Sequence, residues 1–405
     1  MKLKTYCKTI ILCLLANVIY NCTEPFALVT ESFEDVLVVE ATITNELKNQ
    51  EIKLSRTFKL EEGSVPVYET NANVSIITSV NETYTFSHIE NGLYKSNQEF
   101  QAQEGVSYML KIKDSKGDEY MSTDEFLPSS VAIEEINTKL INIEGELGVQ
   151  VLVDSEDTSN DANYFRYEYE ETYKIETELF YRYDIDLDNW KEQGTQPFCA
   201  GDPELIARPE NQKTCYSTNY SNDIIVTSLN GLDESKVSEF PVRFIPVSSH
   251  VLRDRYSILV KQYIQSADAN NFYKVLEELG GDKNLLTDNQ PGFVKGNISL
   301  KDNDNKKVIG FFDVSSITTK RVFFDYSEFE IDKPEYIYNC DDLRTLNYAA
   351  TDPNAENGRA YLFWLLSVKG YKYYGQDACD VFVVPPHCGD CSTFASNEKP
   401  IFWED

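Results

Sequence analysis

The stretch VLVVEATITNELKNQEIKLSRTF, residues 36–58, decides how the first part of this chain folds. Apolar and polar residues alternate through 36–45 and again through 51–58. A period of two places every second side chain on the same face of a β-strand. Each half of the stretch therefore predicts a strand with one buried face, and residues 46–50 connect the two strands.

The same alternation continues as far as residue 124. In GVSYMLKI, Tyr108, Leu110 and Ile112 share one face, and turn residues at 80–82 and 114–118 separate neighbouring strands. The other strand candidates are NVSIITSV (73–80), ETYTFSH (82–88) and EYMSTD (119–124). This succession resembles an immunoglobulin-like or fibronectin-like β-sandwich, which we expect over residues 36–128, with a boundary at Leu127-Pro128-Ser129-Ser130.

Residues 129–405 predict a larger β-rich domain with one or two short helices. The clearest helix carries an apolar stripe with helical spacing, begins at Asp268 and ends at Gly280-Gly281. The stripe consists of Phe272, Val275, Leu276 and Leu279. The run NISLKDNDNKKVIGFFDV (297–314) predicts a hairpin, and Tyr361–Leu366 predicts a late strand. The expected fold class is mainly β.

The N-terminus predicts export. Three lysines precede an apolar run that ends before Cys22, and this run is shorter than the roughly 20 residues that span a bilayer. We interpret residues 1–21 as a signal peptide, Cys22 as a lipidated first residue and 22–35 as a tether. A plain secretory signal followed by a coincidental cysteine is the alternative.

Composition excludes some partners. The chain has 405 residues and a formal net charge of −30, and removal of residues 1–21 would take away three lysines and no acidic residue. An acidic surface repels phosphate, so we expect no nucleic-acid partner. It also disfavours electrostatic docking on anionic lipid, so membrane attachment would depend on the acyl chains of Cys22.

Six cysteines follow the N-terminal region, and an even number in an exported chain suggests disulfides. They are Cys199, Cys215, Cys340, Cys379, Cys388 and Cys391. The preferred single pairing is Cys199–Cys215, which would close a polar loop. Cys340–Cys379 with Cys388–Cys391 is one arrangement of the others; a zinc site or a redox motif at Cys388–Cys391 is a less favoured reading.

The sequence contains no recognised catalytic motif, and we expect a non-enzymatic protein. His88, His250 and His387 are scattered, without a metal-ligand partner at close spacing. We expect no cofactor. Calcium is the one ion considered, because acidic oxygens are abundant. Its candidate sites are Asp154 through Asp161, the run Asp184-Asp186-Asp188, and Asp302-Asp304, all preferentially interpreted as solvated turns or a polar strand face.

A run of aromatic residues follows Ala162. In YFRYEYEETY, we expect Phe165 on the face opposite Tyr167 and Tyr169. Core packing is the preferred reading, and an exposed tyrosine stripe that binds sugars or peptides is the alternative.

Longer strings resemble a family of outer-membrane lipoproteins of the Bacteroidota group, known only as domain of unknown function 4249. The resemblance is carried by Cys22-Thr23-Glu24-Pro25 and by several longer strings. They are VLVVEATITNE, DANYFRYEYEETY, RYSILVKQYIQSADANNFYKVLEEL and the closing HCGDCSTFASNEKPIFWED. Asn21 departs from the small residue usual before the lipidated cysteine.

The resemblance implies an accessory lipoprotein of the outer membrane, more at the cell surface than on the periplasmic face. It implies a partner, a SusC-type TonB-dependent β-barrel receptor, within a transporter or envelope complex. Two alternatives stay open: a surface protein that captures glycans or peptides through Tyr167 and Tyr169, and a hydrolase of unrecognised type.

Overall fold

The computed structural model of the protein describes residues 35–57, 65–156, 162–191, 199, 201–230, 236–280, 294–301, 307–350 and 357–405. The fold is mainly β, as the sequence predicts, with 51% strand and 13% helix. Cys22, the signal peptide predicted at residues 1–21 and most of the tether predicted at 22–35 lie outside the described residues.

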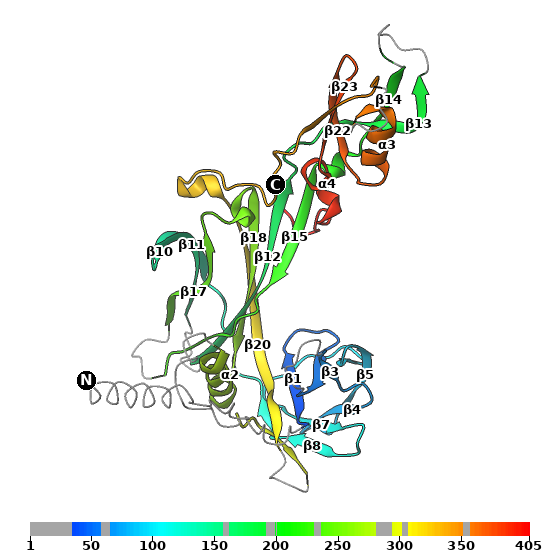
Figure 1. The fold of residues 1–405 in the computed structure, drawn as a ribbon. Coiled ribbons are helices and arrows are strands. Elements are labelled where there is room, and N and C mark those ends of the chain that lie inside the picture. Colours follow the sequence, from blue (N-terminus) through cyan, green and yellow to red (C-terminus); the bar gives the residue numbers. More distant parts are fainter. Residues whose placement is uncertain are drawn as a thin grey trace, which may run out of the picture.

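One long strand, β20 (Val308–Asp325), connects two parts of the molecule. Its first half pairs in parallel with β1 (Leu37–Thr44), and its second half pairs antiparallel with β18 (Arg255–Ile264). The change of partner falls between Ser315 and Ser316. Figure 1 shows β20 running from the lower unit, which holds β1 to β8, up into the central sheet.

The first half of β20 belongs to what we call the N-terminal unit, a sheet of successive strands in the order β20-β1-β2-β6-β5-β4-β7-β8-β19. The other strands are β2 (Glu51–Arg56), β3 (Val67–Tyr68), β4 (Asn73–Thr78), β5 (Thr83–Glu90), β6 (Leu93–Ser96), β7 (Ser107–Lys113), β8 (Glu119–Ser122), β9 (Glu125–Phe126) and β19 (Ile298–Leu300). The immunoglobulin-like arrangement is not confirmed by this order. Strands from residues 298–315 pair with those of 36–128, so that segment does not make the unit alone.

The sheet of the N-terminal unit curls until its two ends meet. The side-chain amide of Asn297 donates to Phe312 O (2.9 Å) and its oxygen accepts from Phe312 N (2.8 Å), which links the β19 end to β20. Gly310 has φ +133°, and a Cβ there would lie 2.0 Å from Val39 O, so only glycine fits this close approach. Every second residue of these strands points to the inside, and the side chains that fill it include Val39, Leu54, Ile76, Leu110 and Phe312.

β19 corrects one expectation. The predicted hairpin at 297–314 does not form, because β19 pairs with β8 and β20 pairs with β1 and β18. Local turn residues in 302–305 suggested a hairpin, but these residues lie outside the described part of the chain. β19 and β20 each pair with strands far away in the sequence and not with each other.

The central sheet continues from β20 in the order β18-β12-β15. These strands are β12 (Tyr164–Glu176) and β15 (Thr214–Tyr220), and β16 (Ile225–Ser228) also pairs with β12. Helix α2 (Ala267–Gly280) packs against this sheet. A side sheet of β10 (Glu135–Ile143), β11 (Glu146–Glu156) and β17 (Lys236–Pro246) packs on the central sheet, and the two share one apolar core. The expected helix is confirmed as α2, and Phe272 on its apolar stripe packs against Phe311 at 5.6 Å.

The third part, the head, is built from two separate excursions of the chain, 177–213 and 330–393. Its elements are β13 (Tyr183–Lys191), β14 (Asp202–Ala207), β21 (Arg344–Asn347), α3 (Gly358–Ser367), β22 (Lys372–Asp377), β23 (Asp380–Val384) and α4 (Pro386–Gly389). Short 3-10 turns are Glu210–Gln212, His250–Leu252, Tyr326–Phe329 and Cys391–Thr393. Figure 1 shows the head at the end of the molecule opposite the N-terminal unit.

Candidate functional site

The head is held together by three disulfides. Cys199 pairs with Cys379, Cys215 with Cys391, and Cys340 with Cys388. The expectation that all six cysteines form disulfides is confirmed. The expected pairings Cys199–Cys215, Cys340–Cys379 and Cys388–Cys391 are wrong, as are zinc and redox readings of the last pair, since neither cysteine is free.

The fold explains the actual pairings. Cys199 lies in the first excursion and Cys379 in the second, so this disulfide joins the two chain segments that make the head. Cys215, near the start of β15, pairs with Cys391, so this disulfide joins the central sheet to the second excursion. Proximity along the sequence favoured short loops, whereas the fold brings cysteines together at separations of 180 and 176 residues.

The most exposed apolar surface of the head lies on α3. Trp364 and Val368 are 41% and 67% exposed, while Leu362 and Leu365 on the opposite side are buried. Tyr361 stacks on Trp364 with ring centroids 5.4 Å apart, and the Lys369 ammonium lies 5.1 Å from the Trp364 ring. This set of Tyr361, Trp364, Val368 and Lys369 is called the α3 face below.

The strand expected at Tyr361–Leu366 is wrong, because these residues belong to helix α3. The Asn357 side chain accepts a hydrogen bond from Gly358 N (2.9 Å) and caps the helix. A short apolar run fits both a buried strand and a helix, and here the spacing of Leu362 and Leu365 on one buried side identifies the helix. That spacing, with the preceding asparagine, is the signal that would have revealed the face.

Tyr167 and Tyr169 do not form an exposed stripe. They are 1% and 7% exposed, and they lie on the same face of β12 as Phe165, beneath the side sheet. The Tyr167 ring stacks on Phe240 of β17 at 5.2 Å, and its hydroxyl donates to Gln262 Oε1 (3.1 Å). The preferred core reading is confirmed, and these two residues cannot be the ligand surface.

The three histidines lie in separate elements. His88 is in β5, His250 in the turn after β17, where burial lowers its pKa, and His387 in α4. Among the described residues, no group of three His, Cys, Asp or Glu side chains is placed to hold a metal ion. Asp157 to Asp161 and Asp302 to Asp304 lie outside those residues. In the described part of the chain, no helix is both long and apolar enough to cross a membrane.

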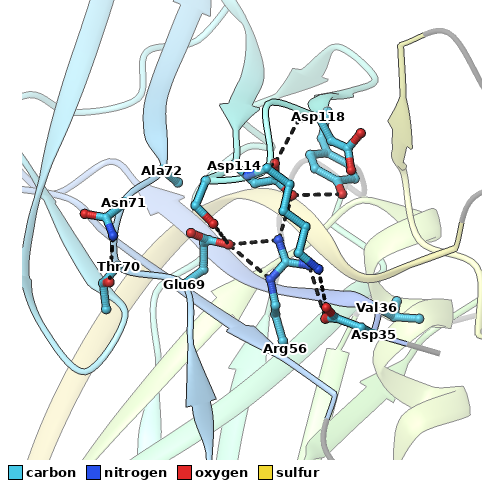
Figure 2. Close-up of polar contacts among 12 residues, drawn as sticks. Asp35, Val36, Arg56, Glu69, Thr70, Asn71, Ala72, Asp114 and Asp118 are labelled. Atoms are coloured by element: carbon cyan, nitrogen blue, oxygen red, sulfur yellow. Dashed lines mark hydrogen bonds and ion pairs between the residues drawn. The ribbon is translucent and has the colours of Figure 1, made fainter. Parts of the chain in front are cut away.

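A buried charge network lies in the N-terminal unit, around Arg56, as Figure 2 shows. Arg56, at the end of β2, contacts Glu69 (2.8 Å), Asp114 (2.6 Å) and Asp35 (3.2 Å). Its side chain is 7% exposed, and those of Glu69 and Asp114 are 3% and 0% exposed. Lys116 forms a further ion pair with Asp35. The network ties the first described residue, Asp35, to the sheet.

The geometry of the network sets the protonation of its carboxyl groups. Burial alone would raise the pKa of Asp114, but hydrogen bonds from Arg56 and from backbone N–H groups outweigh it and lower the pKa. The hydrogen bond from Lys116, opposed by burial and aided by Arg56, lowers the pKa of Asp35. The sequence held one signal for this network: Arg56 continues the inward-facing series of Ile52 and Leu54.

A second buried cluster lies where β20 changes partner. Asp313 is fully buried, and its Oδ2 accepts hydrogen bonds from Gln265 and Ser315, both at 2.7 Å. The Arg166 guanidinium lies 4.2 Å and 4.8 Å from the ring centroids of Tyr263 and Tyr273. Arg166 Nε, Gln265 Oε1 and Asp313 Oδ1 have no hydrogen-bond partner within the described part of the chain.

A cavity of about 640 Å³ opens between α2 and the N-terminal unit. Apolar side chains of Phe272, Val275 and Phe311 line it together with polar Asp268 and Asn297. Nearby, burial raises the pKa of Glu125, which accepts a hydrogen bond from Asn297 at 2.8 Å. The cavity thus combines an apolar wall with the charged side chains of Asp268 and Lys295.

Comparisons with known proteins give one clear match. No curated protein matches the chain. Among solved structures, the crystal structure of trypsin-activated alpha-2-macroglobulin from Escherichia coli is similar over 58% of this chain at 10% identity, with a TM-score of 0.17. The match spans only 15% of that protein, and at this TM-score it carries no argument. Residues 23–321 match the family described as Domain of unknown function (DUF4249), and the chain belongs to that family.

Proposed function

We propose that this protein is a non-catalytic, lipid-anchored subunit of an outer-membrane complex, and that its head binds a protein partner. The partner we propose is a TonB-dependent β-barrel receptor. The single observation that carries the proposal is the α3 face, an apolar surface exposed on the end of the molecule that lies farthest from the N-terminal unit.

The composition of the α3 face favours protein binding. Tryptophan and tyrosine are enriched where protein interfaces concentrate their binding energy. Helix α3, GRAYLFWLLS, is apolar on nearly every side, and a helix of this kind is normally covered all round. Here Leu362 is covered by the head, while Trp364 and Val368 remain open to a partner.

The disulfides support a binding role in an exported protein. Disulfides persist in oxidising compartments, and three of them brace one small part of this chain. Bracing keeps the α3 face in one conformation before a partner arrives, and preorganisation of this kind strengthens binding because less ordering is needed on association.

The test uses the full chain with a C-terminal affinity tag, expressed in its own host and purified in mild detergent. We expect a β-barrel receptor to co-purify with the wild type, and Trp364→Ser with Val368→Ser to reduce its recovery at least tenfold. Ile89→Ser, at a 54% exposed apolar position of the N-terminal unit, is the matched control and should retain the barrel. Equal recovery of the barrel with the wild type, the double variant and the control would refute the proposal that the α3 face binds the receptor.

The lipid anchor is tested separately. Cys22→Ser should move the protein from the membrane fraction to the soluble fraction, because the acyl chains can no longer be attached. Unchanged membrane recovery of that variant would contradict the anchor while leaving the partner experiment intact.

A second candidate function, capture of a small ligand, is favoured by the cavity beside α2. Its apolar wall and the acidic side chain of Asp268 suit a peptide that carries a basic and an apolar side chain. Titration of the purified chain with the dipeptide Lys-Leu, followed by calorimetry, tests this role. Asp268→Asn should weaken the binding, and absence of any binding by the wild type at millimolar peptide would remove this candidate.

A further inference from the structure

Strand β15 lies at the outer end of the largest sheet, with β12 on one side only. Tyr216 exchanges two backbone hydrogen bonds with Ser396 of the C-terminal tail, at 2.7 Å and 3.1 Å. The backbone groups of Tyr216 therefore point away from β12. Because strand geometry repeats every two residues, those of Thr218 and Tyr220 point the same way.

The outer edge of β15 is open beyond Tyr216. In the described part of the chain, the tail makes its single bridge at Tyr216 and the edge has no other strand partner. Thr218 and Asn219 are exposed, and Tyr220 is 63% exposed. Figure 1 shows β15 at the margin of the central sheet, below α4.

This edge lacks the features that normally protect a sheet edge. Proteins blunt such edges with charged residues or proline, and β10 and β14 follow this rule with Glu135, Lys139 and Pro203. β15, TCYSTNY, has neither, although the chain has 104 Asp, Glu, Lys and Arg residues in its 405 positions. β16, also uncharged, packs against α2.

A groove of about 490 Å³ lies between this edge and the tail. Tyr216 and Thr218 form one wall, and Phe394, Glu398 and Pro400 form part of the other. We propose that the open edge of β15 is the docking site for an extended segment of another polypeptide, which adds to the sheet as a further strand. The groove favours a neutral or basic segment with an apolar side chain, because Glu398 and the net charge of −30 disfavour an acidic one.

The tail disfavours a second copy of this chain as occupant. If two β15 strands paired antiparallel around Asn219, Tyr216 of one copy would face residue 222 of the other. Ser396 already occupies that position beside Tyr216, so only Thr218 to Tyr220 would remain to pair. The net charge of −30 on each copy disfavours such a pair further, so we commit to a neutral or basic segment of another polypeptide.

The inference rests on the proposed function only in taking the occupant to be another polypeptide, and its first test needs no partner. Hydrogen exchange is measured on the purified full chain together with its mass in solution. We expect fast exchange at the amides of Thr218 and Tyr220 and slow exchange at Ser217 and Asn219, which face β12. Slow exchange at Thr218 and Tyr220 overturns the proposal. If the protein is then a monomer, the chain itself covers the edge of β15; if it is a dimer, a second copy covers it.

The second test supplies a strand. The segment Lys-Val-Thr-Val-Thr-Val is attached after Asp405 through a flexible Gly/Ser linker, which gives an effective concentration on the order of millimolar. Exchange at Thr218 and Tyr220 should slow at least tenfold. A control segment with proline at alternate positions, which lacks the backbone donors, should leave both amides fast.

A pair of variants at one position completes the test. Thr218→Pro removes the outward N–H and should abolish the slowing at Tyr220, while Thr218→Val keeps the N–H and should retain it. Proline is tolerated at this position because the N–H that it removes faces away from β12. Unchanged protection of Ser217 and Asn219 shows that the variant is folded. The proposal is overturned if amide exchange at Tyr220 is still slowed in Thr218→Pro, or if the attached segment does not slow it in the otherwise unchanged chain. Either result is independent of whether the barrel receptor co-purifies.

Discussion

At the scale of the single residue, the molecule depends on charges placed where water cannot reach them. Arg56 is enclosed with Glu69 and Asp114, and removal of Arg56 would leave these two buried carboxylates without their ion-pair partner. Removing one partner of such a set is far more damaging than removing an exposed ion pair. Arg56 also pairs with Asp35, the first residue that the structure describes.

We therefore expect Arg56→Met to lower the free energy of unfolding by about 3–5 kcal/mol. The exposed neighbour Lys116, which pairs with Asp35, serves as control, and Lys116→Met should change stability by less than about 1 kcal/mol. Urea denaturation followed by circular dichroism measures both. Similar stability of the two variants would mean that the buried network does not hold the unit together.

The same network predicts a response to acid. The pKa of Asp114 is lowered in the folded protein, so its stabilising contribution is present above the unfolded-state value of about 3.9 and is lost as the pH falls through the folded pKa. Arg56→Met removes the main source of this lowering. The variant should therefore lose less stability than the wild type between pH 5 and pH 2, in urea titrations at each pH.

Asp313 predicts the opposite sign. Burial raises its pKa against the opposing effects of Arg166 and of hydrogen bonds from Gln265 and Ser315. Between the unfolded value of about 3.9 and the raised folded value, the folded state binds more protons, so this group lowers stability as the pH rises. Asp313→Asn should flatten that decline in urea titrations at successive pH values. Parallel curves for the variant and the wild type would contradict this account.

At the scale of the element, the same local pattern leads to different outcomes in different surroundings. The alternation in 36–45 and 51–58 became β1 and β2, because each strand has one face on a core and a neighbour on each side. The apolar run at 361–366 became helix α3 instead. An apolar run without alternation does not distinguish a strand from a helix. The sequence therefore predicted β1 and β2 correctly and predicted a strand where helix α3 forms.

The two sides of α3 predict two different effects on stability. Leu362→Ala should lower the free energy of unfolding by about 2–5 kcal/mol, because Leu362 is fully buried in the core of the head. Val368→Ala, at the exposed residue directly after the helix, should change it by no more than about 0.5 kcal/mol. Guanidinium titration followed by tryptophan fluorescence compares them. A large effect of Val368→Ala would mean that the α3 face is covered by the chain itself.

At the scale of the whole molecule, two connections decide the architecture. β20 pairs with strands of the N-terminal unit and of the central sheet. Cys199–Cys379 fastens the two excursions of the head to each other, and Cys215–Cys391 fastens the second excursion to the central sheet. The stability of the head thus depends on links between distant parts of the chain, and cross-links that close long loops restrict the unfolded chain most.

The disulfide pattern can be read directly from a non-reducing digest. Trypsin combined with a protease that cleaves before aspartate separates the cysteines, because Asp380 and Asp390 lie between the last three. Mass spectrometry should find peptides that join Cys199 to Cys379, Cys215 to Cys391 and Cys340 to Cys388. A peptide joining Cys199 to Cys215 would mean that the two excursions are not fastened to each other.

The sequence by itself determined the fold class, the strands at the start of the chain, helix α2 and the use of the six late cysteines in disulfides. Each of these depends on a local pattern, such as a period of two, a helical stripe or an even cysteine count. It could not determine which cysteines pair, that β19 joins β8, that Tyr167 is buried, or that the edge of β15 stays open. These features depend on contacts between residues far apart in the chain, and only the tertiary structure brings such residues together.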